Sequence, residues 1–271
     1  MTHTRRDLTA LLESRGLRPS RALGQNFVVD PNTVRRIARL ANVGENDLVL
    51  EIGAGLGSLT LALLETGAEV IAVEVDRYLL DVLRETVEPH GARVVHADAM
   101  DTDFADILKG RRAVVVANLP YNVATPLVLR LLEEVPEVTR MLVMVQREVG
   151  ERLAASAGDE AYGAVSVRVA YFARARVVGR GGPAVFLPRP HVESALVEIV
   201  RRDAPAVDPE VVSEAALFDV VRTAFAQRRK MLRRSLAEWA SEGVFERAGI
   251  DSTRRPEELS LEEFAKLAAA R

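Results

Sequence analysis

The 271-residue sequence contains no cysteine, and its four histidines (His3, His90, His96 and His191) do not show the spacing of metal ligands. It therefore offers neither a disulfide framework nor a thiolate metal site, and we expect no metal. No apolar run approaches the ~20 residues that a membrane span needs. The first ten residues also lack the apolar centre of a signal peptide. We expect a cytoplasmic protein with no membrane partner.

Aromatic residues are scarce, at 5% of the sequence, whereas 48% of the residues are hydrophobic. A chain of this length and composition can bury a full core, and it has room for one large domain and a small one.

The net charge of −3 conceals a segregation of charge along the chain. Residues 41–110 contain 14 acidic and 4 basic residues, whereas residues 1–40 contain 8 arginines and 3 acids. Residues 161–192 and 222–234 contain five and six basic residues and no acid. Each run alone is typical of a solvated face, but basic flanks around an acidic centre favour a polyanion-binding surface around a small-molecule site.

Short apolar strands alternate with amphipathic helices over most of the chain. We expect strands at residues 47–52, 68–76, 92–98, 112–118, 140–146, 173–180 and 193–202. Residues 163–172 fit a helix or a strand, and the apolar spacing favours a helix. This alternation predicts an α/β fold with a doubly wound, mostly parallel seven-stranded sheet that has an antiparallel edge.

Residues 201–210 ("RRDAPAVDPE") show no periodicity and read as a linker. Helical patterns follow at 211–225 and 227–241, and a last one begins at Ser260 with Glu263 in capping-box spacing. We therefore expect two domains. Residues 1–202 would form an α/β domain that carries the catalytic site and begins with a basic arm, and residues 203–271 would form a small all-helical domain.

The glycine turn "EIGAGLG" (residues 51–57) follows the first strand and allows a ligand to approach the backbone closely. Glu74 ends the next strand, where a carboxylate can accept both hydroxyls of a ribose, and Asp98 ends the third, where it can accept from an adenine amino group. No phosphate-binding G-x-x-x-x-G-K-[ST] motif is present. The pattern favours a cofactor that has an adenosine but no phosphates.

Eight segments then carry a family resemblance: "GQNFVVD", "EIGAGLGSLT", "VEVD", "HADAM", "ANLPYNVATPL", "VQREVGERL", "FLPRPHVESALV" and "FAQRRKMLRRSL". In this order they resemble the ribosomal RNA adenine N6-dimethyltransferases over nearly the whole chain. The closest resemblance is to members that use S-adenosylmethionine to dimethylate two adjacent adenosines near the 3′ end of 16S rRNA in the small ribosomal subunit. The resemblance implies a Rossmann-like class I methyltransferase that serves ribosome biogenesis, and nothing in it demands more than a monomer.

The resemblance also assigns roles to individual residues. It implies a cofactor site formed by Asn26, Val28, Gly53, Glu74, Asp98 and Asn118, and a catalytic group formed by Asn118, Leu119, Pro120, Tyr121 and Phe186. Two departures concern RNA contacts: the usual "GPGLG" reads "GAGLG", and "PPPKVDS" reads "PRPHVES" here, which places His191 and Glu193 where a lysine and an aspartate are usual.

The segment "NLPY" suits the amino group of a nucleobase. The Asn118 side-chain oxygen and the Leu119 carbonyl can accept its two hydrogens and orient the nitrogen lone pair, while Pro120 stiffens the loop. Tyr121 can stack on one face of an extruded adenine. Phe186, flanked by proline, is expected to be exposed and to cover the other face.

The run "QRRKMLRR" places Arg229 with Arg233 and Lys230 with Arg234 at i,i+4 spacing, so we expect one basic helix that grips RNA phosphates. The amino-terminal Arg15, Arg18 and Arg21 are expected to clamp the RNA near Asn26. Three alternatives stay open: a 23S rRNA dimethyltransferase of the macrolide-resistance type, a ribosome-assembly factor with little catalysis, and a DNA adenine methyltransferase.

Overall fold

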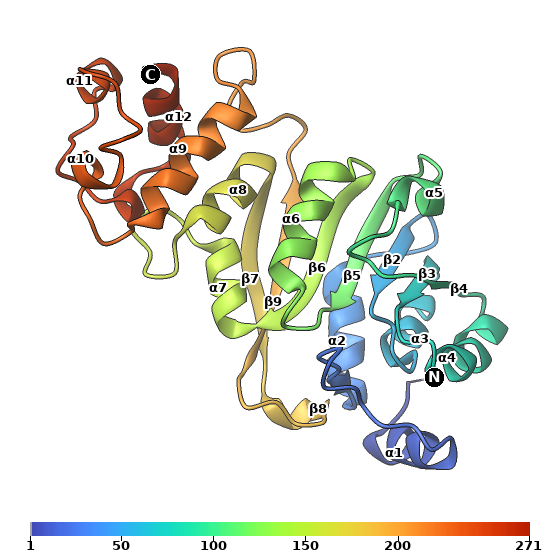
Figure 1. Ribbon diagram of the computed structural model, residues 1–271. Coiled ribbons are helices and arrows are strands. Elements are labelled where there is room, and N and C mark those ends of the chain that lie inside the picture. Colours follow the sequence, from blue (N-terminus) through green and yellow to red (C-terminus); the bar gives the residue numbers. More distant parts are fainter. Residues whose placement is uncertain (1) are drawn as a thin grey trace. The chain divides into compact units, whose positions relative to one another are not determined.

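The computed structural model describes residues 2–271 and divides the chain into two units (Figure 1). Unit 1 comprises the residues up to Gly150 together with Val177–Val200, and unit 2 comprises Glu151–Arg176 and Arg201–Arg271. The division expected at residue 202 assigned residues 151–176 to the first domain. In the structure this segment packs with the carboxy-terminal helices instead, because Val167 and Tyr171 belong to their hydrophobic core.

A seven-stranded sheet organises the α/β part, and its strands lie in the order β4-β3-β2-β5-β6-β9-β7. The strands β2 to β6 pair in parallel, and β9 pairs antiparallel with β6. The fold class expected from the sequence is therefore confirmed. The strand bounds are β2 Leu48–Ile52, β3 Glu69–Glu74, β4 Arg93–His96, β5 Ala113–Asn118, β6 Val138–Gln146, β7 Ala173–Gly181 and β9 Ser194–Arg201.

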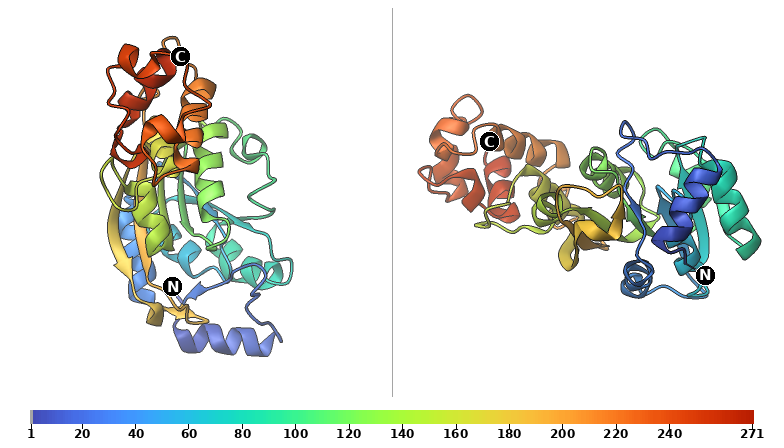
Figure 2. Two further views of the ribbon diagram at one scale, coloured as in Figure 1. Left: turned by 60° about the vertical axis from the view of Figure 1, so that its left-hand side comes forward. Right: turned by 90° about the horizontal axis from the view of Figure 1, so that it is seen from below.

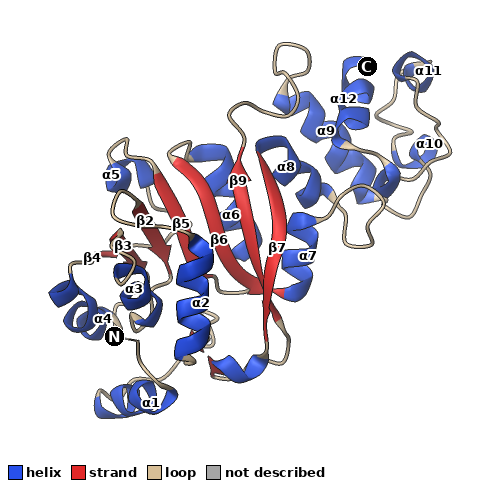
Figure 3. Ribbon diagram, turned by 180° about the vertical axis from the view of Figure 1, so that it is seen from behind, coloured by secondary structure: helices blue, strands red, loops and turns tan. Residues whose placement is uncertain are grey.

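Helices cover both faces of the sheet in unit 1. Helix α6 lies in front of the sheet in Figure 1, and α2 lies in front of it in the view from behind in Figure 3. The helix bounds are α2 Pro31–Ala41, α3 Ser58–Leu64, α4 Leu80–Val87, α5 Phe104–Leu108 and α6 Ala124–Glu134, with a short 3-10 turn η1 at Glu88–His90. Helix α7 (Arg147–Ala154) begins in unit 1, and its residues from Glu151 onward belong to unit 2. Because both faces are covered, the central strand β2 is buried at every position.

The local sequence explains why α2 forms and which face it buries. Asp30 caps the helix by accepting from the Thr33 N–H at 2.9 Å, and Asn42 ends it in the left-handed conformation. The buried residues Val34, Ile37, Ala38 and Ala41 recur at helical spacing and form one apolar stripe against the sheet.

The amino-terminal segment is fixed to a later part of unit 1. Helix α1 (Arg5–Ser14) lies beside the two-residue strand β8 (Phe186–Leu187), which pairs antiparallel with β1 (Phe27–Val28) (Figures 1 and 2). The Arg5 guanidinium donates to the carbonyls of Ala184 and Phe186 at 2.6 and 3.0 Å, next to the 3-10 turn η2 (Pro183–Val185). We call residues 15–26, between α1 and β1, the amino-terminal strap.

Unit 2 is helical, and Figure 2 shows its carboxy-terminal helices gathered together. Its elements include α8 Ala164–Phe172, α9 Glu214–Ala226, α10 Leu232–Ser235, α11 Val244–Ala248, η3 Pro256–Glu258 and α12 Leu261–Ala269. Helix α12 begins with the expected capping box between Ser260 and Glu263. Within residues 2–271 no helix is both long and apolar enough to cross a membrane.

The basic helix expected at 227–241 is wrong. Helix α9 ends at Ala226, and only the four residues of α10 are helical within this range. The reason is tertiary, because the N–H groups of Leu232 and Arg233 donate to the carbonyls of Arg254 and Ser252 at 2.8 and 2.9 Å and not to a preceding helical turn. The basic side chains are therefore displayed from a turn and a short helix.

The glycine turn before α3 generates a testable prediction about stability. Gly57 has φ +83°, and an added Cβ would lie 2.5 Å from the Val87 side chain. We expect Gly57→Ala to lower the free energy of unfolding by about 1–3 kcal/mol more than Gly110→Ala, because only at Gly57 does the added methyl group meet a neighbouring side chain. Urea unfolding of the two variants measures the difference.

Gly110→Ala is the matched control. Its φ is +73°, and a Cβ there meets nothing within 4 Å, so only the left-handed backbone cost of about 1–2 kcal/mol applies. Equal unfolding midpoints for the two variants would show that the Val87 contact has no energetic role.

Candidate functional site

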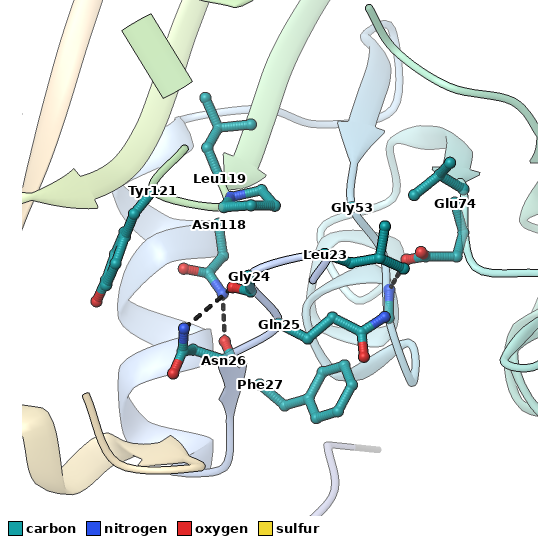
Figure 4. Close-up of a pocket in the computed structure, with 13 residues that line it drawn as sticks. Leu23, Gly24, Gln25, Asn26, Phe27, Gly53, Glu74, Asn118, Leu119 and Tyr121 are labelled. Carbon is teal, nitrogen blue, oxygen red and sulfur yellow. Dashed lines mark hydrogen bonds between the residues drawn. The ribbon is translucent and has the colours of Figure 1, made fainter. Parts of the chain in front are cut away.

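Three adjacent cavities lie at the carboxyl ends of β2, β3 and β5, with volumes of about 60, 220 and 30 Å³. Gly53 lines all three. Glu74 and Tyr121 line the first cavity (Figure 4). Asp98 lines the second cavity, and Val28 lines the third. The parallel sheet therefore brings together residues from distant segments, as expected for an open α/β sheet.

The glycine loop needs its glycines for contact as well as conformation. Gly55 has φ +58°, and a Cβ at this position would lie 2.9 Å from the Phe27 ring. Its N–H donates to Glu74 Oε2 at 2.7 Å. The loop is thus held between β1 and the end of β3, with its backbone facing the first cavity.

The two acids expected at the cofactor site differ in environment. Glu74 is 4% exposed, its second oxygen accepts from the Asp76 N–H at 2.9 Å, and burial raises the pKa of its carboxyl above the usual value. Asp98 is exposed, and its Oδ1 accepts from the Met100 N–H at 2.8 Å. Each carboxylate oxygen accepts more than one hydrogen bond, so these backbone contacts orient the acids without using up their capacity.

A third acid, Glu51, was missed by the sequence-based assignment although it opens the glycine motif. It is 2% exposed and lines the smallest cavity together with Ser58 and Asn118. Among the described residues, Glu51 Oε2 and Ser58 Oγ are buried and have no hydrogen-bond partner, and the Thr60 hydroxyl, which lowers the pKa of Glu51, lies beside them. Burial raises the pKa of Glu51 to about 8, and the nearby charge of Glu74 adds to the rise. Buried polar atoms are seldom left unsatisfied, so this group indicates a ligand.

Asn118 ends β5, and its orientation is determined by the strap. Its Nδ2 donates to the Asn26 carbonyl at 2.8 Å, and Asn26 Nδ2 in turn donates to the Gly24 carbonyl at 3.0 Å (Figure 4). A backbone carbonyl can only accept, so the amide must present its nitrogen to Asn26. The Asn118 side-chain oxygen is then left to accept from a group in the cavity.

The residues after Asn118 hold the loop in place. The buried Leu119 donates its N–H to the Met144 carbonyl at 3.0 Å, and the Pro120 carbonyl accepts from Val123 and Ala124. The half-buried Tyr121 lines the first cavity, and its hydroxyl lies 3.3 Å from Ser194 Oγ. Ser194 is 0% exposed, which makes it a fixed anchor for the tyrosine.

The expectation that Phe186 is exposed is wrong. Phe186 is 0% exposed and belongs to a hydrophobic core cluster that also contains residues of α2, α3 and the sheet. It is buried there because β8 pairs with β1 and brings Phe186 opposite Val28. It lines none of the three cavities. Its contribution is to hold Val28, which lines the third cavity, in position.

The strap also contacts the end of β3. Gln25 Nε2 donates to Asp76 Oδ2 at 2.8 Å, and Gln25 Oε1 accepts from the Ser20 N–H at 2.7 Å. Arg15 pairs with Glu85. Arg18 and Arg21, the other arginines expected to clamp RNA, are exposed on the strap. In the part of the chain that the structure describes, no cluster of three or more histidine or acidic side chains is arranged to hold a metal ion.

The buried Glu51 generates a prediction about pH. Between pH 4.5 and about 8 the folded protein retains a proton on Glu51 that the unfolded chain has lost. The stabilisation present below pH 4.5 therefore declines as pH rises, with a slope of up to about 1.4 kcal/mol per pH unit, and reaches its minimum above pH 8.

Glu51→Gln removes this proton, so the stability of the variant relative to the wild type should increase from pH 5 to pH 8. Thermal unfolding of both proteins in ligand-free buffer across this range provides the measurement. Parallel stability curves would contradict the assignment of the proton to Glu51.

Comparison with known sequences agrees with this geometry. A family model described as "Ribosomal RNA adenine dimethylase" matches residues 17–270. The chain is 47% identical to the ribosomal RNA small subunit methyltransferase A of Thermobifida fusca, over 98% of this chain and 94% of that protein. It is 48% identical to the protein of the same name from Acidothermus cellulolyticus, over 97% and 93% of the two chains.

Solved structures show the same fold. A dimethyladenosine transferase from Plasmodium falciparum superposes with a TM-score of 0.74 at 24% identity, covering 88% of this chain and 94% of its own. The 23S rRNA methyltransferase ErmE gives 0.71 at 24% identity, covering 90% and 98%. At this identity the structures establish the fold alone, but the family match extends over nearly the whole sequence. The chain belongs to the ribosomal RNA adenine dimethylase family.

Proposed function

We propose that this enzyme dimethylates N6 of two adjacent adenosines near the 3′ end of 16S rRNA in the small ribosomal subunit, as a step of ribosome biogenesis. The observation that carries the chemistry is the Asn118 amide, whose nitrogen is bound to Asn26 while its oxygen is left for the cavity. The choice of the small subunit is supported by the names of relatives that are 47–48% identical over nearly full length.

The lining residues fit S-adenosylmethionine, the cofactor of this family. Glu74 would accept the ribose hydroxyls, and Asp98 would accept from the adenine amino group. The unsatisfied Glu51 carboxyl would hold the positively charged amino group of the methionine part. The buried acid would then have a partner of opposite charge. When bound, the cofactor supplies an electrophilic methyl group on a sulfonium.

Asn118 and its neighbours would act on the adenine amino group, whose lone pair is delocalised into the ring. The Asn118 oxygen and the Leu119 carbonyl would accept its two hydrogens and favour a nitrogen with a localised lone pair. An amide achieves this without a buried charge that needs a partner. The strap and the Leu119–Met144 hydrogen bond fix both acceptors beforehand, so the contribution is orientation and electrostatic preorganisation.

Tyr121 would hold the extruded base by stacking, with its ring position set by Ser194. No strong base is required, because the nitrogen loses its proton after it has become positively charged. Transfer of this kind needs neither a metal nor a second subunit, so we propose a monomeric enzyme that works without metal in the cytoplasm, where small subunits mature.

The direct test is transfer of labelled methyl groups from S-adenosylmethionine to small subunits that lack the modification, with large subunits and 23S rRNA in parallel. We expect label as N6,N6-dimethyladenosine at adjacent 16S adenosines. Label confined to 23S rRNA would replace the proposal by a resistance-type enzyme, and binding without any label would replace it by an assembly factor.

Asn118→Ala removes the fixed acceptor. We expect the rate of methyl transfer at saturating substrate to fall by about 10²–10³-fold, as for loss of one preorganised catalytic contact, while the affinity for small subunits changes little. Asn32→Ala is the control, because Asn32 is an exposed residue in the first turn of α2. An equal loss of transfer rate and subunit affinity in Asn118→Ala would contradict its role as an acceptor.

The Tyr121–Ser194 contact predicts a graded series. Ser194→Ala removes a hydrogen bond that contributes about 0.5–1.5 kcal/mol, and should lower kcat/KM for small subunits roughly 2- to 10-fold. Tyr121→Ala loses base stacking of about 1–3 kcal/mol and should lower kcat/KM roughly 5- to 150-fold.

Tyr121→Phe combined with Ser194→Ala should be no worse than Ser194→Ala alone, because both changes remove the same contact. Steady-state kinetics on the wild type, Tyr121→Phe, Ser194→Ala and the double variant measures this coupling. Additive losses in the double variant would mean that Ser194 acts independently of the tyrosine.

A further inference from the structure

A separate cavity of about 220 Å³ lies wholly within unit 2. It is formed by the end of α7, by α8 and by the start of β7, and is completed by Arg202. Five alanines form much of its wall: Ala154, Ala155, Ala170, Ala173 and Ala175. Their short side chains leave the two arginines of the lining, Arg174 and Arg202, uncovered.

These arginines give the cavity a single sign of charge. The lining contains no carboxylate and no histidine. Within residues 2–271, no hydrogen bond or ion pair engages the Arg174 side chain, and the Arg202 side chain makes one hydrogen bond, from Nε to the Ala170 carbonyl at 3.0 Å. Two guanidinium groups without an acidic partner in one concave site are suited to an anion.

The contacts of Arg202 also preorganise its side chain. Its backbone N–H donates to the Phe172 carbonyl at 2.9 Å, so both ends of the residue are tied to the last turn of α8. The guanidinium is therefore held at the cavity with less loss of side-chain freedom on binding than a free arginine would suffer. Arg174, at the start of β7, is exposed and completes the pair.

We propose that this cavity binds a phosphate of the RNA backbone and holds the substrate from unit 2, independently of the cofactor cavities. The proposal rests on the proposed function for its partner, since an enzyme acting on ribosomal RNA meets phosphodiesters as its commonest anion. Paired guanidinium groups recognise phosphate through several parallel N–H donors, and they do so without reading sequence. The site therefore contributes affinity and register and no base specificity.

The test uses the full chain carrying Arg174→Ala and Arg202→Gln together. Glutamine keeps an N–H donor for the Ala170 carbonyl while removing the charge. We measure the dissociation constant for unmodified small subunits over a series of salt concentrations. Loss of one phosphate contact should weaken binding and reduce the slope of log Kd against log salt by about one. KM for subunits should rise, while kcat and the affinity for S-adenosylmethionine should stay as in the wild type.

Two further variants isolate the phosphate contact. Arg174→Lys keeps the charge and should retain most of the affinity. Arg112→Ala removes an exposed arginine at the amino end of β5, the sheet edge opposite the cofactor cavities, and should behave as wild type. An unchanged salt slope in the double variant, or an equal loss in Arg112→Ala, would overturn the proposal.

The two proposals fail in different ways. If the wild type neither binds nor methylates small subunits, the proposed function fails. If the wild type does both and the double variant keeps its affinity and salt slope, the function stands and the phosphate site falls.

Discussion

The hydrogen bond from Asn118 Nδ2 to the Asn26 carbonyl is the interaction on which the site depends. It joins the end of a central strand to a strap 92 residues earlier in the sequence, and it determines which atom of the amide faces the cavity. The strap is held in turn by the β1–β8 pairing, by the Arg5 contacts and by Gln25 on Asp76. The orientation of the Asn118 amide is therefore a property of the packed amino terminus as much as of the "NLPY" segment.

The gathering of Glu74, Asp98 and Asn118 at one edge of the sheet could be predicted from the sequence because it depends on local features. Alternation of strands and helices specifies a parallel sheet, and parallel strands place their carboxyl ends along one edge. Glu74 and Asn118 each end a strand of that sheet, and Asp98 follows closely after another. Once the strands are identified, the approximate position of each of these side chains follows without further information.

The errors concern residues whose environment is set by distant partners. Phe186 looks exposed beside its prolines, but its burial depends on pairing with Val28 across the β1–β8 ladder. The basic residues in 227–241 do recur at helical spacing. The N–H groups of Leu232 and Arg233 nevertheless donate to carbonyls of residues 254 and 252, and not to the carbonyls that a continuous helix would offer. The grouping of residues 151–176 with unit 2 depends likewise on a core shared with α9. Periodicity reports on a single element and carries no information about such contacts.

Glu51 shows how the same site opposes folding and favours binding. A fully buried carboxyl with an unsatisfied oxygen destabilises the folded chain. The rise of the Glu51 pKa to about 8 reflects how strongly burial disfavours its charged form. A hydrophobic residue would pack there without this penalty, but it would offer nothing to a cationic ligand. Ser58, whose buried hydroxyl lines the same cavity without a partner, has the same character. Unsatisfied buried polar atoms of the described residues therefore lie at the smallest of the three cavities, as expected where local stability has been given up for binding. Ligand binding should accordingly restore part of the lost stability, most strongly at the pH values where Glu51 is ionised.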